Sequence, residues 1–201
     1  MADTITTYRQ AMAAALKDES NEIWSAAELD AALRLALAEL SQRLPNSQQA
    51  DLTLAESGRQ VPIADLPGCM WVEEVWWPFA AGEYPPNPVP FEQSQGELRL
   101  LVPELPAAGD VVRLLYAARQ TVAGLDEASE TSVPEQWRGT LVLGAAAYAA
   151  LAKCVAMARE YNWSSWSAGA MQRWGETMLA LFQARLRTLR APGVQPWVSW
   201  A

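Results

Sequence analysis

Histidine does not occur in this sequence of 201 residues. Its absence removes the side chain that proteins use most often as a general base, a metal ligand or a pH switch. Ser-His-Asp and Cys-His catalytic sets are therefore excluded. There are only two cysteines, Cys69 and Cys154, far apart and in no metal-binding spacing. We expect two free thiols in a reducing compartment, with a disulfide as the alternative.

Long uncharged apolar runs are also missing. The most apolar stretch begins at Thr140 and reaches Lys153 after 13 uncharged residues, whereas a membrane-spanning helix needs about 20. We therefore expect a buried helix and no membrane contact. Gly139 and Gly144 match neither a dinucleotide-binding nor a phosphate-loop pattern. No charged-then-apolar leader is present, so we expect no secretion signal. No catalytic, metal or cofactor site is predicted.

The net charge of −8 is distributed unevenly. Residues 1–133 contain 8 basic and 20 acidic residues, and residues 134–201 contain 7 basic and 3 acidic residues. Neither part has the dense basic patch that nucleic-acid binding requires. One end of the molecule should therefore be acidic and another mildly basic.

Tryptophan is abundant, with ten copies. Indole rings bury large areas and are enriched in protein interfaces. Ordinary core positions explain most of them, but their number also indicates a large contact surface.

Helical periodicity marks both ends of the chain. In the first predicted helix Ile5, Tyr8, Met12 and Leu16 share one face. In the second, Ser25 and Glu28 form a capping box, and Pro45 ends the helix. Its buried stripe is expected to consist of Leu29, Leu33, Leu37, Leu40 and Leu44.

The middle of the chain has strand chemistry instead. Residues 51–63 are predicted to form a short hairpin around Ser57-Gly58. Residues 69–79, 97–106 and 109–122 are predicted strands, rich in Val, Leu and aromatic residues. A proline-rich loop, "YPPNPVP", precedes the last two; a rigid connection at a sheet edge is favoured over a polyproline ligand.

Helices return after the acidic loop at 124–130. Pro134 suits a first helical turn, and the small residues of "GAAAYAALA" would let another helix approach closely. One face of this helix should carry Leu141, Ala145, Tyr148, Ala152 and Val155. The last helix should carry Met171, Trp174, Met178, Leu181, Phe182 and Leu189 at helical spacing.

These elements predict an α+β fold, a bundle of four helices with a small antiparallel β-subdomain inserted. The expected divisions are 1–50 with 123–191 for the bundle, 51–122 for the insertion and 192–201 for an extended C-terminal tail.

Few residues offer chemistry. Glu73 and Glu74 are adjacent in a strand, where alternation would send them to opposite faces, so an acid–base pair is disfavoured. The acidic run Asp126, Glu127 and Glu130 does not match a calcium loop. A carbohydrate-binding module, stacking sugars on a Trp-rich strand, is an alternative that the flanking helices disfavour.

Three stretches carry a resemblance to a known family: "ESNEIWSAAELDAALRLALAELS", "GELRLLVPELPAAGDVVRLLYAARQTVAGLD" and "TSVPEQWRGTLVLGAAAYAALA". In order and spacing the sequence resembles the head-to-tail adaptors of tailed bacteriophages, also called connector or neck proteins. The resemblance spans most of the chain and is less typical between Trp71 and Phe91.

This resemblance implies a structural virion protein of the neck, made in the host cytoplasm and without enzymatic activity. Its partners would be the portal protein, neighbouring copies in a ring of commonly twelve, and a stopper or tail-completion protein. DNA would pass through the lumen without specific binding, which suits a net negative chain. Another tail-associated or carbohydrate-contacting module is the alternative.

Two sets of residues are the candidate contacts. In the tail, Pro196 breaks the helix, and Trp197, Val198 and Trp200 would anchor on the portal, with folding back onto the chain's own bundle as the alternative. In the β insertion, the expected interface residues are Trp71, Trp76, Trp77, Phe79, Tyr84 and Phe91.

Overall fold

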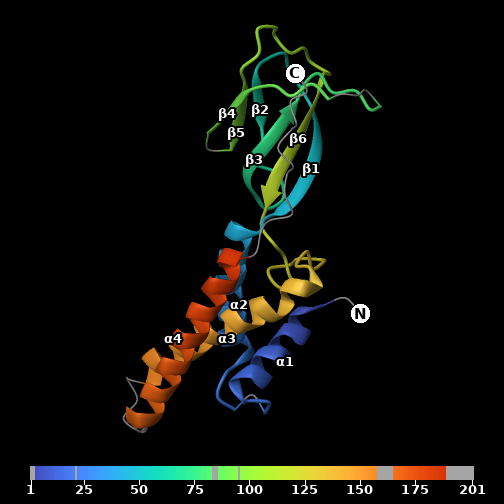
Figure 1. The fold of residues 1–201 in the computed structure, drawn as a ribbon. Helices are drawn as coiled ribbons and strands as arrows, with labels where there is room; N and C mark the ends of the chain where they lie inside the picture. Colours follow the sequence, from blue (N-terminus) through green and yellow to red (C-terminus); the bar gives the residue numbers. More distant parts are fainter. Residues whose placement is uncertain (1–2, 21, 83–85, 95, 158–164, 189–201) are drawn as a thin grey trace. The chain divides into compact units, whose positions relative to one another are not determined.

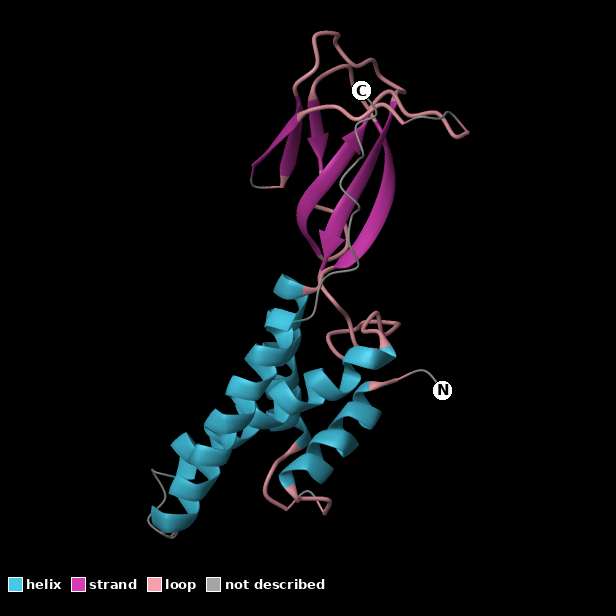
Figure 2. Ribbon diagram, viewed as in Figure 1, coloured by secondary structure: helices cyan, strands magenta, loops and turns pink. Residues whose placement is uncertain are grey.

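The computed structural model describes residues 3–20, 22–82, 86–94, 96–157 and 165–188. Within these ranges the chain forms four helices and two three-stranded antiparallel sheets (Figures 1 and 2), which confirms the predicted α+β class. The helices belong to one compact unit, formed by Met1–Pro45 and Gln120–Ala201, and the strands to a second, Asn46–Arg119. We call these the helical unit and the β unit.

The helical unit contains four helices around one hydrophobic core. Tyr8 and Met12 of the first helix are fully buried, and Ile5 and Leu16 pack against the same core. The predicted first face is therefore confirmed. The helices are α1 (Ile5–Leu16), α2 (Ala26–Arg43), α3 (Glu135–Met157) and α4 (Ser165–Thr188).

The start of α2 forms as its sequence predicts. The Ser25 hydroxyl accepts from the Glu28 backbone N–H at 3.3 Å, and the Glu28 carboxylate accepts from the Ser25 backbone N–H at 2.8 Å. This capping box satisfies amides that the first turn leaves without helical partners. All five leucines of the predicted stripe lie in the core, Leu29, Leu33, Leu37, Leu40 and Leu44.

Two glycines bring α3 and α4 close together. A Cβ atom on Gly144 of α3 would lie 2.8 Å from three ring atoms of Phe182, and Phe182 of α4 is fully buried. In the reverse direction, a Cβ on Gly175 of α4 would lie 2.9 Å from Leu151 of α3. The close approach that the small residues predict is confirmed, and each helix receives a large side chain of the other.

Both predicted faces of these helices are partly exposed. On α3, Leu141 and Ala145 are buried, whereas Val155 is 61% exposed. On α4, Phe182 and Leu186 are buried, but Leu181 is 41% exposed. Leu181 and Phe182 differ in exposure because adjacent helical residues point about 100° apart. Leu189 lies outside the described residues.

Asp18 stabilises the turn between α1 and α2. Its buried carboxylate accepts hydrogen bonds from the backbone N–H groups of Glu22, Ile23 and Trp24 at 3.0–3.1 Å. Burial raises the pKa of this carboxyl, but the three hydrogen bonds together outweigh burial, so its pKa is lowered.

We expect Asp18→Asn to lower the melting temperature at pH 7 and to lose this effect in acid. A depressed folded-state pKa contributes stability above the unfolded value of about 4, and this contribution is lost as the pH falls through the folded pKa. Thermal melts at pH 7 and pH 3 measure the difference, with Glu19→Gln at the neighbouring exposed carboxylate as the control. An equal deficit at both pH values would contradict this role.

The β unit contains two small sheets with one shared core. The first has the order β1-β6-β3 and the second β2-β5-β4, and every pairing is antiparallel. Buried side chains from both sheets, including Leu98, Val112 and Leu114, form the core. The strands are β1 (Asn46–Thr53), β2 (Gln60–Pro62), β3 (Cys69–Trp76), β4 (Phe91–Ser94), β5 (Glu97–Leu100) and β6 (Val111–Ala118).

The predicted hairpin around Ser57-Gly58 does not form. β1 pairs with β6, and β2 pairs with β5, so the two segments belong to different sheets. Instead, the segment around Gly58 contacts the loop before β6. The Gly58 backbone N–H donates to the Pro106 carbonyl at 3.0 Å. β1 also begins at Asn46, earlier than the strand chemistry expected from Asp51.

Strict alternation fails along β3. The register against β6 shifts between Cys69 and Trp71 and again between Val72 and Glu74. As a result Val72 and Val75, three residues apart, are both core residues. A β-bulge therefore interrupts the alternation that the prediction of opposite faces for Glu73 and Glu74 required.

Polar contacts fasten the helical unit where the chain returns to it. The Gln120 backbone N–H donates to the Ser41 hydroxyl at 3.0 Å, and its side-chain amide donates to the Leu44 carbonyl at 2.8 Å. Its amide oxygen accepts from the Ser132 hydroxyl at 2.7 Å. Gln120 is buried, and these bonds satisfy polar groups that would otherwise be costly to bury.

Candidate interaction surface

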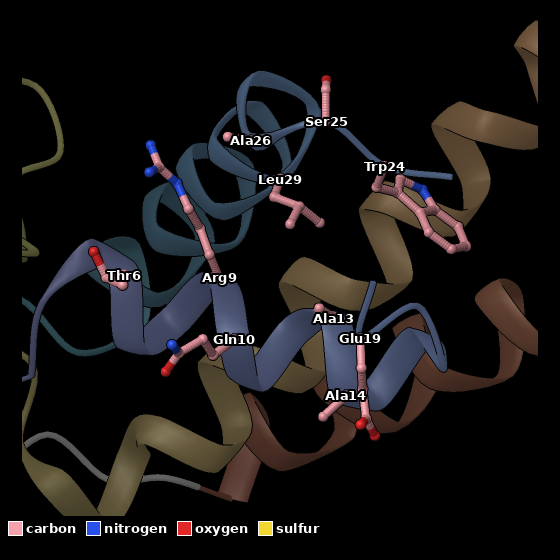
Figure 3. A pocket seen from close by; sticks show the side chains of 10 residues that line it. All are labelled: Thr6, Arg9, Gln10, Ala13, Ala14, Glu19, Trp24, Ser25, Ala26 and Leu29. Atoms are coloured by element: carbon pink, nitrogen blue, oxygen red, sulfur yellow. The ribbon is translucent and has the colours of Figure 1, made fainter. Parts of the chain in front are cut away.

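A groove of the helical unit has no catalytic arrangement among the residues that line it. It has a volume of about 770 Å³ and lies between α1 and the start of α2 (Figure 3). Arg9 extends from α1 toward α2, where its guanidinium donates to Asp30 at 2.6 and 2.7 Å. The hydrogen bond to Asp30 raises the pKa of Arg9. The lining residues are Thr6, Arg9, Gln10, Ala13, Ala14, Glu19, Trp24, Ser25, Ala26 and Leu29.

The acidic residues of the described chain do not form a cation site. No cluster of three or more Asp, Glu, Cys or His side chains suited to a metal occurs among the described residues. In the acidic run before α3, Asp126 pairs with Arg34 at 2.7 Å, and this hydrogen bond lowers the pKa of its carboxyl. Asp126 therefore has a structural partner.

One face of the first sheet is a better candidate for function. On β6, Val112, Leu114 and Tyr116 point into the core, so the intervening residues point to the opposite side. We call that side the outer sheet face. From the register, it carries Ser47, Gln49, Asp51 and Thr53 of β1; Val111, Arg113, Leu115 and Ala117 of β6; and Trp71, Glu74 and Trp76 of β3.

A row of side chains crosses this face at Arg113. Its guanidinium donates to both carboxylate oxygens of Asp51 at 2.6 Å, and Trp76 is its register partner on β3. The guanidinium also stacks on the Phe79 ring at 3.7 Å from its centroid, and Phe79 lies 6.3 Å from Trp76 between ring centroids. The hydrogen bond to Arg113 lowers the pKa of Asp51. An ion pair and two aromatic rings thus form one ordered strip.

The predicted interface residues of the insertion do not share one surface. Trp71 is 39% exposed and Trp76 and Phe79 are half-buried at the outer sheet face. Trp77 is instead a core residue, and its indole N–H donates to Asp110 at 3.2 Å. Phe91 packs against the same core.

The remaining predicted contacts are Tyr84 and the tail residues Pro196, Trp197, Val198 and Trp200. They lie outside the described residues. The outer sheet face was not predicted from the sequence, although the almost unbroken apolar run "VVRLLYAA" of β6 is a signal for it.

By length and composition, the segment Glu135–Ala156 of α3 could also cross a membrane, but half of it is buried inside the structure. A helix in the core of a helical bundle can have the same length and hydropathy as a membrane-spanning helix.

No protein family matches the sequence, and no curated protein does. Among solved structures, a chain from "Neck of native GTA particle computed with C12 symmetry" is similar, with 19% identity over 98% of both chains and a TM-score of 0.28.

Proposed function

We propose that this chain is a structural subunit of a phage neck, a head-to-tail adaptor that forms a ring beneath the portal. The ring would link the DNA-filled head to a stopper or tail component and let DNA pass. The proposal rests on the family resemblance of the sequence together with one structural observation. That observation is the outer sheet face, whose central strand is apolar where a solvated sheet would be polar.

An assembly role accounts for this face more simply than a free monomer does. On this face Trp71 is 39% exposed, and Val111, Leu115 and Trp76 are half-exposed. Apolar and aromatic side chains that remain accessible together mark interaction sites on soluble proteins. The overall charge of −8 is also consistent with a ring through which DNA slides, because each cation pressed against phosphate would add salt-dependent affinity.

The carbohydrate-binding alternative has less support. It needs Trp71, Trp76 and Trp77 to present one stacking platform. Trp77 lies in the core, so at most two of the three indoles share a surface.

Electron cryomicroscopy of the assembled particle tests the proposal directly. We expect the chain between portal and tail, in a closed ring. Locating it anywhere else in the particle would contradict the proposed function.

The C-terminal tail gives a second test. We expect Trp197→Ala with Trp200→Ala to weaken portal binding by at least about 30-fold, because a hot-spot aromatic contributes about 2 kcal/mol or more. The melting temperature of the free chain should not change. Titration of fluorescent portal measures the affinity, and Ser199→Ala is the matched control. A large drop in melting temperature with intact portal binding would show that the tail folds back onto its own bundle.

A further inference from the structure

The central strand of the first sheet is built to be covered on both faces. Inward, Val112, Leu114 and Tyr116 join the core. Outward, three of four residues are apolar, and Arg113 is the exception. Strands that read as continuous apolar runs are typical of sheets buried on both sides. On this outer face Ala117 is fully buried, Val111, Leu115 and Trp76 are half-exposed, and Trp71 is 39% exposed, so the described residues of the β unit cover the face only in part.

The exposed face of α4 carries positive charge. Arg173, Thr177, Leu181 and Arg185 recur every four residues and are all exposed, as are the small residues beside them. On this row the exposed Leu181 lies between Thr177 and Arg185, about 100° around the helix from the buried Phe182.

The charges of the two surfaces are complementary. The β unit contains ten acidic and four basic residues. Glu74 lies on the outer sheet face, and Glu73 beside it is also half-exposed. Described α4 contains three arginines and one glutamate. Complementary potentials of this kind orient partners and fix which surfaces meet.

We propose that the outer sheet face of one copy packs on the exposed face of α4 of a second copy. Leu181 covers Leu115 and Trp71, while Arg185, one turn further along the same exposed row, lies toward Glu73 and Glu74. Two different surfaces meet, so the contact is head-to-tail and propagates around a ring. The inference rests on the proposed adaptor function, because a ring places a second copy beside each chain.

Charge reversal on each surface tests this contact. One variant carries Glu73→Arg and Glu74→Arg on the outer sheet face, and the other carries Arg185→Glu on α4. Each alone brings like charges together at every contact and should weaken self-association at least about tenfold by sedimentation velocity. Mixed in equal amounts they alternate, so every contact again joins opposite charges, and association should return to the wild-type level.

A second pair of variants tests the apolar part without changing charge. Leu181→Ala should weaken self-association and leave the melting temperature unchanged, since Leu181 is exposed. The control is Leu35→Ala on α2, which removes a leucine that is 55% exposed and outside the proposed contact. It should change neither self-association nor the melting temperature.

The proposal is overturned if the wild-type chain stays monomeric, if single-surface reversals have no effect, or if the mixture associates no better than each variant alone. Portal binding of the same proteins separates this result from the function. Rescue by mixing without any portal binding would refute the adaptor and leave the contact standing. Portal binding without rescue by mixing would refute the proposed contact and leave the adaptor function standing.

Discussion

Alanine at Gly144 should destabilise the helical unit, whereas alanine at Gly139 on the same helix should stabilise it. At Gly144 the new methyl would lie 2.8 Å from the buried Phe182 ring, and at Gly139 nothing lies within 4 Å. Overpacking of this kind costs about 1–3 kcal/mol. At an open helical site the same change contributes about 0.5–1 kcal/mol by restricting the unfolded chain.

Thermal melting followed by the helical circular dichroism signal measures both. Gly139→Ala is the matched control, because the chemical change is identical and only the neighbours differ. We expect the stabilities of the two variants to differ by about 1.5–4 kcal/mol. If Gly144→Ala were as stable as Gly139→Ala, the packing of Phe182 into α3 would be wrong.

The second large effect is expected at two neighbouring leucines of β6. Leu114 is fully buried in the core of the β unit, and Leu115 is half-exposed on the outer sheet face. Leu114→Ala should lower the stability of this unit by about 2–5 kcal/mol through lost burial and the cavity left behind.

Leu115→Ala should cost the free chain less than about 1 kcal/mol, since surface substitutions have small effects, but should weaken self-association. Urea unfolding followed by tryptophan fluorescence and sedimentation velocity separate these two consequences. Equal losses of stability at both positions would show that the outer sheet face is already covered within one chain.

Local signals predicted the helical unit well. The capping box at Ser25 and Glu28 needs only residues three apart, and the leucine stripe of α2 needs only the helical period. The small residues of α3 indicated a close neighbour. They could not indicate that the neighbour is Phe182, because the pairing of α3 with α4 depends on the fold of both.

The β unit was harder to predict, because strand pairing is not local. Residues 51–63 have the composition of a hairpin, but each arm has a better partner elsewhere, β6 for one and β5 for the other. The bulges of β3 likewise have no clear sequence signature, and they decide that Trp76 points outward while Trp77 enters the core. Contact residues within a strand can therefore be predicted only after register is known.

The pairing of Asn46 with Ala118 has a consequence for how the chain folds. These residues lie near the two ends of the β unit, a 74-residue segment inserted between the two segments of the helical unit. Closing so long a loop has an entropic cost that a short one avoids. When β1 and β6 are paired, Pro45 and Gln120 lie close together, as if a tight turn joined them. Pairing of β1 with β6 thus holds the two segments of the helical unit next to each other, as a short connection would.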